Sequence, residues 1–342
     1  TSDGLSLNGY WFQGNAIDKQ RPDAVMMFPA PGNKVNDAWI GLARALSEKN
    51  FSVLLFDWRG CGLNAADTAG SRIFEDKTKF WTELYNRQLL KPSQKLLEDK
   101  GLDYKTISAK SDTLYRYRDF MLNDLLAARY YLDRQNDNGK CNTNRVWIVT
   151  EKDGGQLGLA FIVSEFSRNT IYNPKKASAT EETQFKAAGK DYCGLTTLSY
   201  ASNNATASAV FKNGMNLLNL LPQKECKDHL EHRLAMVMVY GKKEGAASSK
   251  SAVAQAGAGG SDEEMRKNFK YMREMDNSKQ AKAISGIDLI DPMDSFGTKA
   301  DIVKAMVEIS RDKQNFGKDA TDREANKMTF TPRFEAEKFG RR

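Results

Sequence analysis

Residues 144–161 (NRVWIVTEKDGGQLGLAF) constrain the fold of this chain more than any other stretch. Residues 146–149 are a short apolar run rich in β-branched side chains, and Gly154 and Gly155 follow within five positions. Apolar or small residues then recur at helical spacing, at Leu157, Ala160, Phe161 and Ser164. The pattern predicts a buried strand, a tight turn and a helix in direct succession.

Strand and helix patterns alternate along the rest of the chain. We expect further strands at 5–12, 24–28, 52–56, 192–199, 234–240 and 284–290. We expect further helices at 38–50 with Asp37 as N-cap, at 120–135, at 262–275 after a capping box at Ser261 and Glu264, and at 298–311. Another helix is expected to end at 217–221, before Pro222. Alternation of this kind is typical of an α/β protein whose mostly parallel sheet is covered by helices on both faces.

Three segments depart from this alternation. Residues 63–118 are polar and too long for an ordinary connection, so we expect a long excursion over the strand ends. Residues 246–260 are small-residue low-complexity sequence and predict a flexible loop. Residues 313–342 are polar and predict a C-terminal tail, which leaves one domain over residues 1–312.

The charge balance argues against a nucleic-acid binder. The 342 residues carry a net charge of +7, and the 51 Lys and Arg are interspersed with 44 Asp and Glu. A nucleic-acid-binding protein more often shows a basic stripe interleaved with aromatic residues. We also expect no transmembrane segment, because no apolar run approaches the roughly 20 residues that span a bilayer.

The four cysteines do not form a regular framework. They are Cys61, Cys141, Cys193 and Cys226, and no CxxC motif occurs. In a chain of this length we interpret them as buried thiols, with one bridged pair as the alternative in an exported protein. The first residue is Thr1, which leaves open whether a leader preceded it.

Several stretches together resemble the α/β-hydrolase family, and within it a group of exported hydrolase-like proteins of planctomycete type. They are DGLSLNGYWF, FDWRGCGLN, FWTELYNRQ, LNDLLAARYYLDRQNDNGKCNTNRVWIVTEKDGGQLGLAFI, MVYGKKEG and ISGIDLIDP. The most specific part is residues 120–161. The resemblance implies an α/β-hydrolase fold with an eight-stranded sheet and export, for example to a periplasm, and it supplies no substrate.

In that family the turn after the central strand is the nucleophile elbow, G-x-S-x-G. Thr150, Lys152 and Gly154 occupy its three defined positions here, so a lysine replaces the serine. A lysine of ordinary basicity is protonated at neutral pH and does not attack an ester. Glu151 and Asp153 flank Lys152 and stabilise its charge, so we interpret Lys152 as a surface or salt-bridged residue.

The two other catalytic positions are equally degenerate. Glu244, in GKKEG, stands where the family carries its acid, and we interpret it as a plain loop carboxylate. The histidine should follow the last strand, but residues 288–297 contain none. The only histidines are His229 and His232, upstream of the strand at 234–240. We therefore expect no catalytic residues.

The oxyanion-hole segments are better preserved than the triad. Backbone N–H groups of Ala30 and Gly32, together with those of Asp153 and Gly154, predict a possible pocket for a small anionic ligand. Such donors need no particular side chain, so they indicate a retained fold rather than retained chemistry.

A metal site is not indicated. Cys226, His229 and His232 share one helix face, but a fourth ligand is missing and the spacing matches no standard zinc site. We expect neither a metal nor a cofactor.

Three functional hypotheses remain. The first is a catalytically inactive hydrolase-fold protein that acts by binding, as a structural or protein-interaction subunit with a protein partner or with copies of itself. The second is a hydrolase or lyase that uses Glu151, Asp153 or Glu244 as a non-standard base. The third is a diffuse polyanion binder that uses the basic excess and the tail ending in Arg341 and Arg342.

Overall fold

The computed structural model describes residues 7–16, 20–59, 61–64, 118–171, 185–201, 220–242, 247–255, 270–275, 285–290 and 297–311. Glu244, most of the excursion at 63–118 and the tail at 313–342 lie outside these ranges. The predictions made for them, including the predicted course of the excursion and of the tail, are not tested by this structure.

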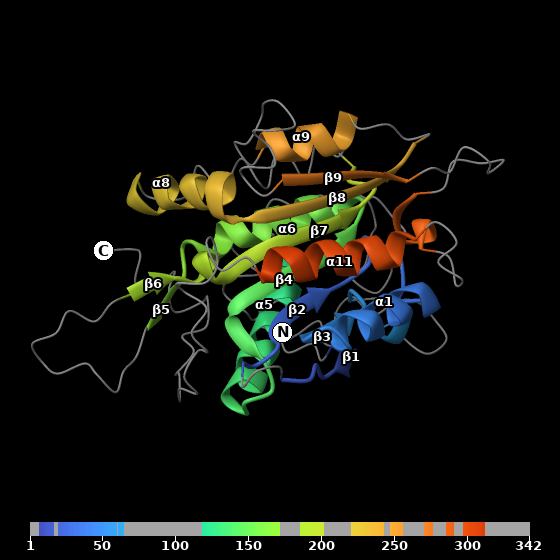
Figure 1. The fold of residues 1–342 in the computed structure, drawn as a ribbon. Coiled ribbons are helices and arrows are strands. Elements are labelled where there is room, and N and C mark those ends of the chain that lie inside the picture. Colours follow the sequence, from blue (N-terminus) through green and yellow to red (C-terminus); the bar gives the residue numbers. More distant parts are fainter. Residues whose placement is uncertain are drawn as a thin grey trace, which may run out of the picture.

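A seven-stranded sheet forms the centre of the described chain (Figure 1). Its strands, in spatial order, are β1 (Gly9–Phe12), β3 (Phe51–Phe56), β2 (Asp23–Met27), β4 (Asn142–Glu151), β7 (Tyr192–Leu198), β8 (Ala235–Gly241) and β9 (Lys270–Met275). Only β1 runs antiparallel to its neighbour, and all other pairs are parallel. A separate antiparallel pair consists of β5 (Asn169–Ile171) and β6 (Phe185–Ala187).

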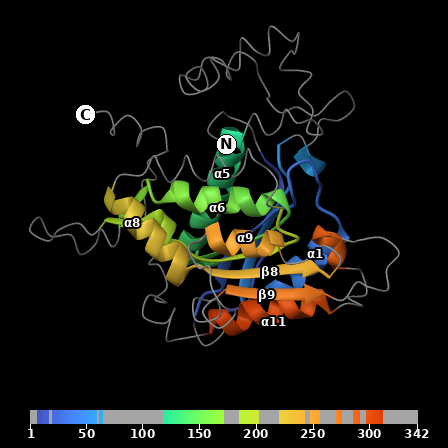
Figure 2. The ribbon, with the colours of Figure 1, turned by 90° about the horizontal axis from the view of Figure 1, so that it is seen from above.

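Helices cover both faces of this sheet (Figure 2). One face carries α1 (Asp37–Ser47) and α11 (Thr298–Ser310), and the other carries α5 (Arg118–Asp137), α6 (Asp153–Glu165), α8 (Leu220–Asp228) and α9 (Ala247–Gln255). Four short helical turns complete the described elements: η1 (Gly62–Asn64), η2 (Ala188–Asp191), η3 (His229–Arg233) and η4 (Gly286–Leu289).

The apolar run at 146–149 is continuous because both of its faces are buried. Val146 and Ile148 pack in the cluster under α5 and α6, whereas Trp147 and Val149 pack in the cluster under α1 and α11. A strand covered on both sides has no solvent face that would require polar residues. The prediction of an α/β protein with a mostly parallel sheet is confirmed, although the described residues supply seven of the eight strands expected in the main sheet.

Two predicted elements near the C-terminus were wrong. Residues 270–275, expected to end a helix, form β9, which pairs with β8 and satisfies the outer backbone groups of that strand. Residues 284–290, expected to be a strand, contain η4 instead. Gly286 has φ +64°, a left-handed value that interrupts an extended backbone.

Three smaller predictions also need correction. Residues 247–255 form α9 instead of belonging to a flexible loop. Pro222 lies in the first turn of α8 rather than after a helix, a position where its missing N–H is tolerated. The N-cap of α1 is Asn36, whose side chain accepts a hydrogen bond from the Trp39 amide at 3.2 Å, and Asp37 is the first helical residue.

Candidate functional site

The elbow predicted from the sequence lies at the carboxyl end of β4, near the middle of the sheet. Lys152 has φ 46° and ψ −125°, between the last residue of β4 and the first residue of α6. Its amide donates to the carbonyl of Leu198 at 2.9 Å, which fixes the turn against the end of β7. A Cβ at Gly154 would lie 2.1 Å from Thr150 Oγ1, so the close approach of helix and strand requires a glycine there.

The backbone of Lys152 is strained for any residue with a side chain. Positive φ in a non-glycine residue outside a regular left-handed turn costs about 1–3 kcal/mol. Lys152→Gly should relieve this strain, offset in part by about 0.5–1 kcal/mol of glycine backbone entropy. We therefore expect a net gain of about 1 kcal/mol in the free energy of unfolding, measured by urea denaturation. Lys152→Val should instead lose stability, and equal stability of the two variants would contradict the strain.

Glu151, directly before Lys152, is buried, and both oxygens of its carboxylate accept hydrogen bonds. Its Oε1 accepts hydrogen bonds from the amide of Ala30 at 3.2 Å and from Asn33 Nδ2 at 2.8 Å. Its Oε2 accepts from the amide of Ile287 at 2.8 Å. The side chain is 1% exposed. The Ala30 amide, which the sequence offered as a donor to a bound anion, therefore already serves a carboxylate of the chain itself.

The other residues predicted to form a pocket lie in the loop after β2 and in the first turn of α6. Gly32 follows Ala30 in the loop after β2, and its backbone amide faces the Cys61 thiol. Burial raises the pKa of that thiol to about 11, and the Gly32 amide opposes the rise without reversing it. Asp153 and Gly154 form the first turn of α6. Because burial raises its pKa, the Cys61 thiol is protonated at neutral pH and is not an activated nucleophile.

The two histidines lie near the amino ends of the parallel strands, whereas the turn at Lys152 lies at their carboxyl ends. His229 Nε2 is 2.7 Å from the carbonyl of Tyr192, which is the first residue of β7, and the ring packs against Phe166. His232 is on the surface, 3.7 Å from Glu231. Both residues precede β8, whose seven residues span about 20 Å toward the end that carries the elbow. Neither imidazole can reach the side chain of Lys152.

All four cysteines are buried and outside disulfides, which confirms their interpretation as buried thiols. Burial also raises the pKa of Cys226 to about 12. Within the described ranges, no group of three or more His, Cys, Asp and Glu side chains is arranged to hold a metal ion.

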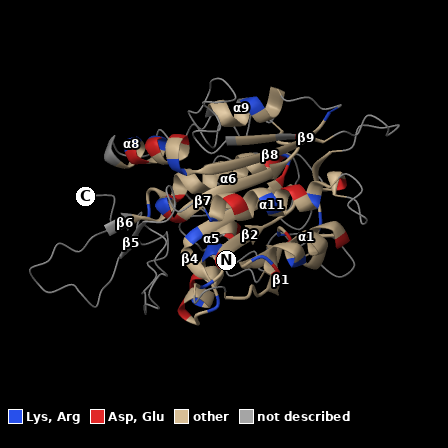
Figure 3. Cartoon of the chain, in the orientation of Figure 1, with Lys and Arg blue, Asp and Glu red and all other residues tan. Residues whose placement is uncertain are grey.

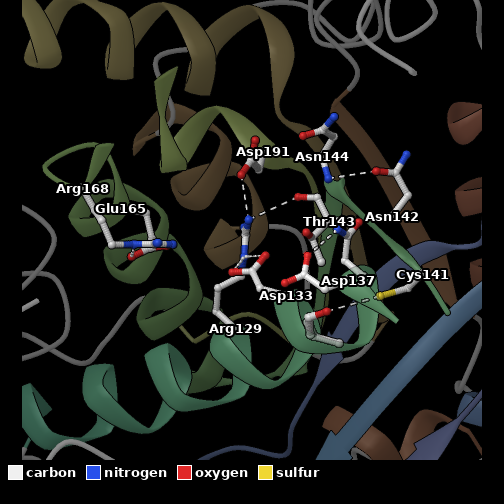
Figure 4. Close-up of polar contacts among 12 residues, drawn as sticks. Arg129, Asp133, Asp137, Cys141, Asn142, Thr143, Asn144, Glu165, Arg168 and Asp191 are labelled. Carbon is white, nitrogen blue, oxygen red and sulfur yellow. Dashed lines mark hydrogen bonds and ion pairs between the residues drawn. The ribbon is translucent and has the colours of Figure 1, made fainter. Parts of the chain in front are cut away.

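A buried ionic cluster lies near the amino-terminal ends of β4 and β7 (Figure 4). We define the Arg129 cluster as Arg129, Asp133 and Asp191. Arg129 Nη2 donates to Asp191 at 2.7 Å and Nε donates to Asp133 at 3.1 Å, and the guanidinium lies over the ring of Tyr192 at 5.4 Å. Burial alone would lower the pKa of Arg129, but the neighbouring carboxylates outweigh it and raise the pKa well above its usual range.

Arg129 lies within the helix expected at 120–135, but the sequence pattern does not predict its partners. Asp133 is one turn further along α5, whereas Asp191 lies 62 residues away, as the last residue of η2 directly before β7. A second buried pair, Glu165 and Arg168, lies beside the cluster at the end of α6. No feature of the site at the elbow depends on these residues, so we assign them to stability.

No family model matches this sequence, and no curated protein matches it either. Several solved structures resemble the chain at low identity. The esterase Est22 is 11% identical, with 90% of this chain and 82% of that chain covered and a TM-score of 0.42. One of two fungal esterases from Rhizomucor miehei is 10% identical, with 92% and 82% covered and a TM-score of 0.45.

A monoacylglycerol lipase from Paleococcus ferrophilus is 11% identical, with 89% of this chain and 100% of that chain covered and a TM-score of 0.39. Among the described helices, none is long and apolar enough to cross a membrane.

The fold assignment depends on the sheet order, the single antiparallel edge strand of the described sheet and the turn after β4. These features give the chain the α/β-hydrolase fold.

Proposed function

We propose that this protein keeps the hydrolase fold without acyl-transfer chemistry and acts by binding, as a structural or protein-interaction subunit. The observation that carries the proposal is the backbone of Lys152, which holds a lysine in the strained turn that presents a serine in active hydrolases. Acyl transfer also needs a base within hydrogen-bond reach of the nucleophile. Both histidines lie near the amino ends of the strands, far from the turn at Lys152.

The alternative of a non-standard acidic base receives little support from the described carboxylates. Both oxygens of Glu151 accept hydrogen bonds in a closed environment, so neither faces a substrate. Asp153 is partly exposed at the first turn of α6, where a negative charge is favourable for the helix itself. Glu244 lies outside the described residues, so its role is decided by experiment.

Two surface features favour a protein partner over a polyanion. Tyr130 and Tyr131 on α5 are 45% and 38% exposed, and aromatic side chains are enriched at protein interfaces. Both charge signs alternate over the described helices (Figure 3), as in the pair of Lys190 and Glu225 at 2.9 Å. A polyanion site more often gathers one sign on one face. Export remains part of this proposal.

The test is chemical and uses a variant that restores the missing hydroxyl. We expect that neither the wild type nor Lys152→Ser is labelled by a fluorophosphonate probe, and that neither hydrolyses p-nitrophenyl acetate above the buffer rate. The serine variant has the right backbone but no base, and the neighbouring Ala30 amide remains occupied by Glu151. A catalytic triad without its base typically loses more than about 10⁴-fold in rate.

The opposite results would be unambiguous. Turnover by the wild type that disappears in Lys152→Ala would end the proposal. Turnover that survives in Lys152→Ala but is lost in Asp153→Asn or Glu244→Gln would establish the acidic-base alternative instead. Light scattering at several concentrations then tests self-assembly, and a concentration-independent monomer directs the search to a different partner.

A further inference from the structure

We propose that the chain has a carboxylate-binding site beside Lys152, which it fills with the side chain of its own Glu151. The donors are the amide of Ala30, the side-chain amide of Asn33 and the amide of Ile287. They come from the loop after β2 and from η4, which are 121 and 136 residues from Glu151 in the sequence. The inference goes beyond the proposed function, because the site exists whether or not the protein turns over a substrate.

The backbone segments that carry the donors are held in place independently of Glu151. The backbone amide of Asn33 donates a hydrogen bond to the carbonyl of Ala30 at 2.9 Å, which closes the turn after β2. The amide of Gly286 donates to Ser199 Oγ at 2.7 Å, and the amide of Ile290 donates to the carbonyl of Ile287 at 2.9 Å. Removal of the carboxylate therefore leaves a set of oriented donors rather than a collapsed loop.

The shape of the site matches a planar carboxylate. Two donors converge on one oxygen and one donor serves the other, which is within the lone-pair capacity of a carboxylate. A Cβ added at Gly286 would lie 2.1 Å from Glu151 Oε2, so the glycine provides the space that this oxygen occupies. The donors include two backbone N–H groups, the type that binds anions in preorganised loops.

Glu165 is a matched buried carboxylate of a different kind. It is 2% exposed, as Glu151 is 1% exposed, but its partner is the guanidinium of Arg168 three residues later in the chain. Truncation of Glu165 leaves a buried cation on a flexible side chain. Truncation of Glu151 leaves a rigid set of N–H donors, and only this second arrangement should select a carboxylate by its size.

The experiment compares Glu151→Ala with Glu165→Ala in thermal unfolding. The atoms that the first substitution removes are a methylene and a carboxylate, which together correspond to acetate. We expect sodium acetate to raise the Tm of Glu151→Ala in a saturating manner, beyond the effect of sodium chloride at equal ionic strength. The wild type and Glu165→Ala should respond equally to the two salts. Butyrate, which is longer than the vacated space, should act less than acetate.

A second substitution tests the donors. Glu151→Ala combined with Asn33→Ala should require several-fold more acetate for half of the maximal Tm rise, because one of the three donors is lost. If acetate and chloride act equally on Glu151→Ala, or if Glu165→Ala gains as much from acetate, the site does not exist as proposed.

If Glu151→Ala does not fold, amide hydrogen exchange of the wild type and of Glu151→Gln tests the proposal instead. The amides of Ala30 and Ile287 should be protected in the wild type, since each donates to the Glu151 carboxylate. Glu151→Gln keeps the volume but places an NH₂ group against one donor, so exchange at Ala30 or Ile287 should accelerate at least about tenfold. Absence of protection in the wild type would overturn the proposal. Esterase assays do not enter this result, so it can fail separately from the proposed function.

Discussion

Replacement of Arg129 by methionine is expected to lower the free energy of unfolding by about 3–5 kcal/mol. The guanidinium is fully buried and bridges Asp133 on its own helix and Asp191, the last residue of η2. Methionine fills most of the volume but removes the positive charge that both buried carboxylates contact. The cost of removing one partner from a buried ion pair comes mainly from the charges left behind, not from the lost attraction.

The matched control is Arg134→Met, on the same helix α5 but exposed to solvent. A surface substitution of this kind should stay within about 0.5 kcal/mol of the wild type. Urea denaturation followed by circular dichroism measures both variants. A second variant, Arg129→Met with Asp191→Asn, should recover part of the loss, since it removes one of the two buried negative charges that Arg129 contacts. Equal losses in Arg129→Met and Arg134→Met would show that the cluster does not stabilise the fold.

The fold was largely predictable because the burial pattern is local. The run at 146–149 and the helical spacing after Gly155 define a strand and a helix within one window, and both occur as expected. The errors at 270–275 and 284–290 arise where the local pattern does not decide between helix and strand: KYMREM mixes charged and apolar residues, and ISGIDLI is a short, mostly apolar run. In those places tertiary contacts decide: β9 forms because β8 needs a neighbour, and η4 forms at the left-handed Gly286.

The site was predictable only in part, because its contacts are distant in sequence. The strand, the turn at Lys152 and the following helix could be predicted directly from the local pattern. The capture of the Ala30 amide by Glu151 could not, since the two residues are separated by more than a hundred positions and no periodicity joins them. One signal was available for His229, which lies six residues before the first residue of the strand at 235–241 and so belongs to the amino end of that parallel strand.

Replacement of Gly194 by alanine is expected to cost about 3 kcal/mol, the upper end of the range for an overpacked core. Gly194 in β7 pairs with Trp147 in β4, and an added Cβ would lie 2.1 Å from Cζ3 of that indole. The indole cannot withdraw easily, because it is fully buried and meets the ring of Phe51 edge to face at 6.4 Å. The strands β4 and β7 would have to separate, although they form the centre of the sheet.

The control is Gly41→Ala in α1, where an added Cβ meets nothing within 4 Å and alanine should add about 0.5–1 kcal/mol of stability. Both substitutions reduce the backbone freedom of the unfolded chain, which by itself stabilises the fold. A loss of unfolding free energy in Gly194→Ala and a gain in Gly41→Ala, measured by urea denaturation, would therefore show a steric conflict at Gly194. Gly194→Ala combined with Trp147→Leu should recover part of the loss, because the smaller side chain vacates the contested space. If the double variant is less stable than Gly194→Ala, the contact with Trp147 is not the cause. Because β4 ends in Glu151 and the elbow, this packing also holds the candidate site at its edge of the sheet.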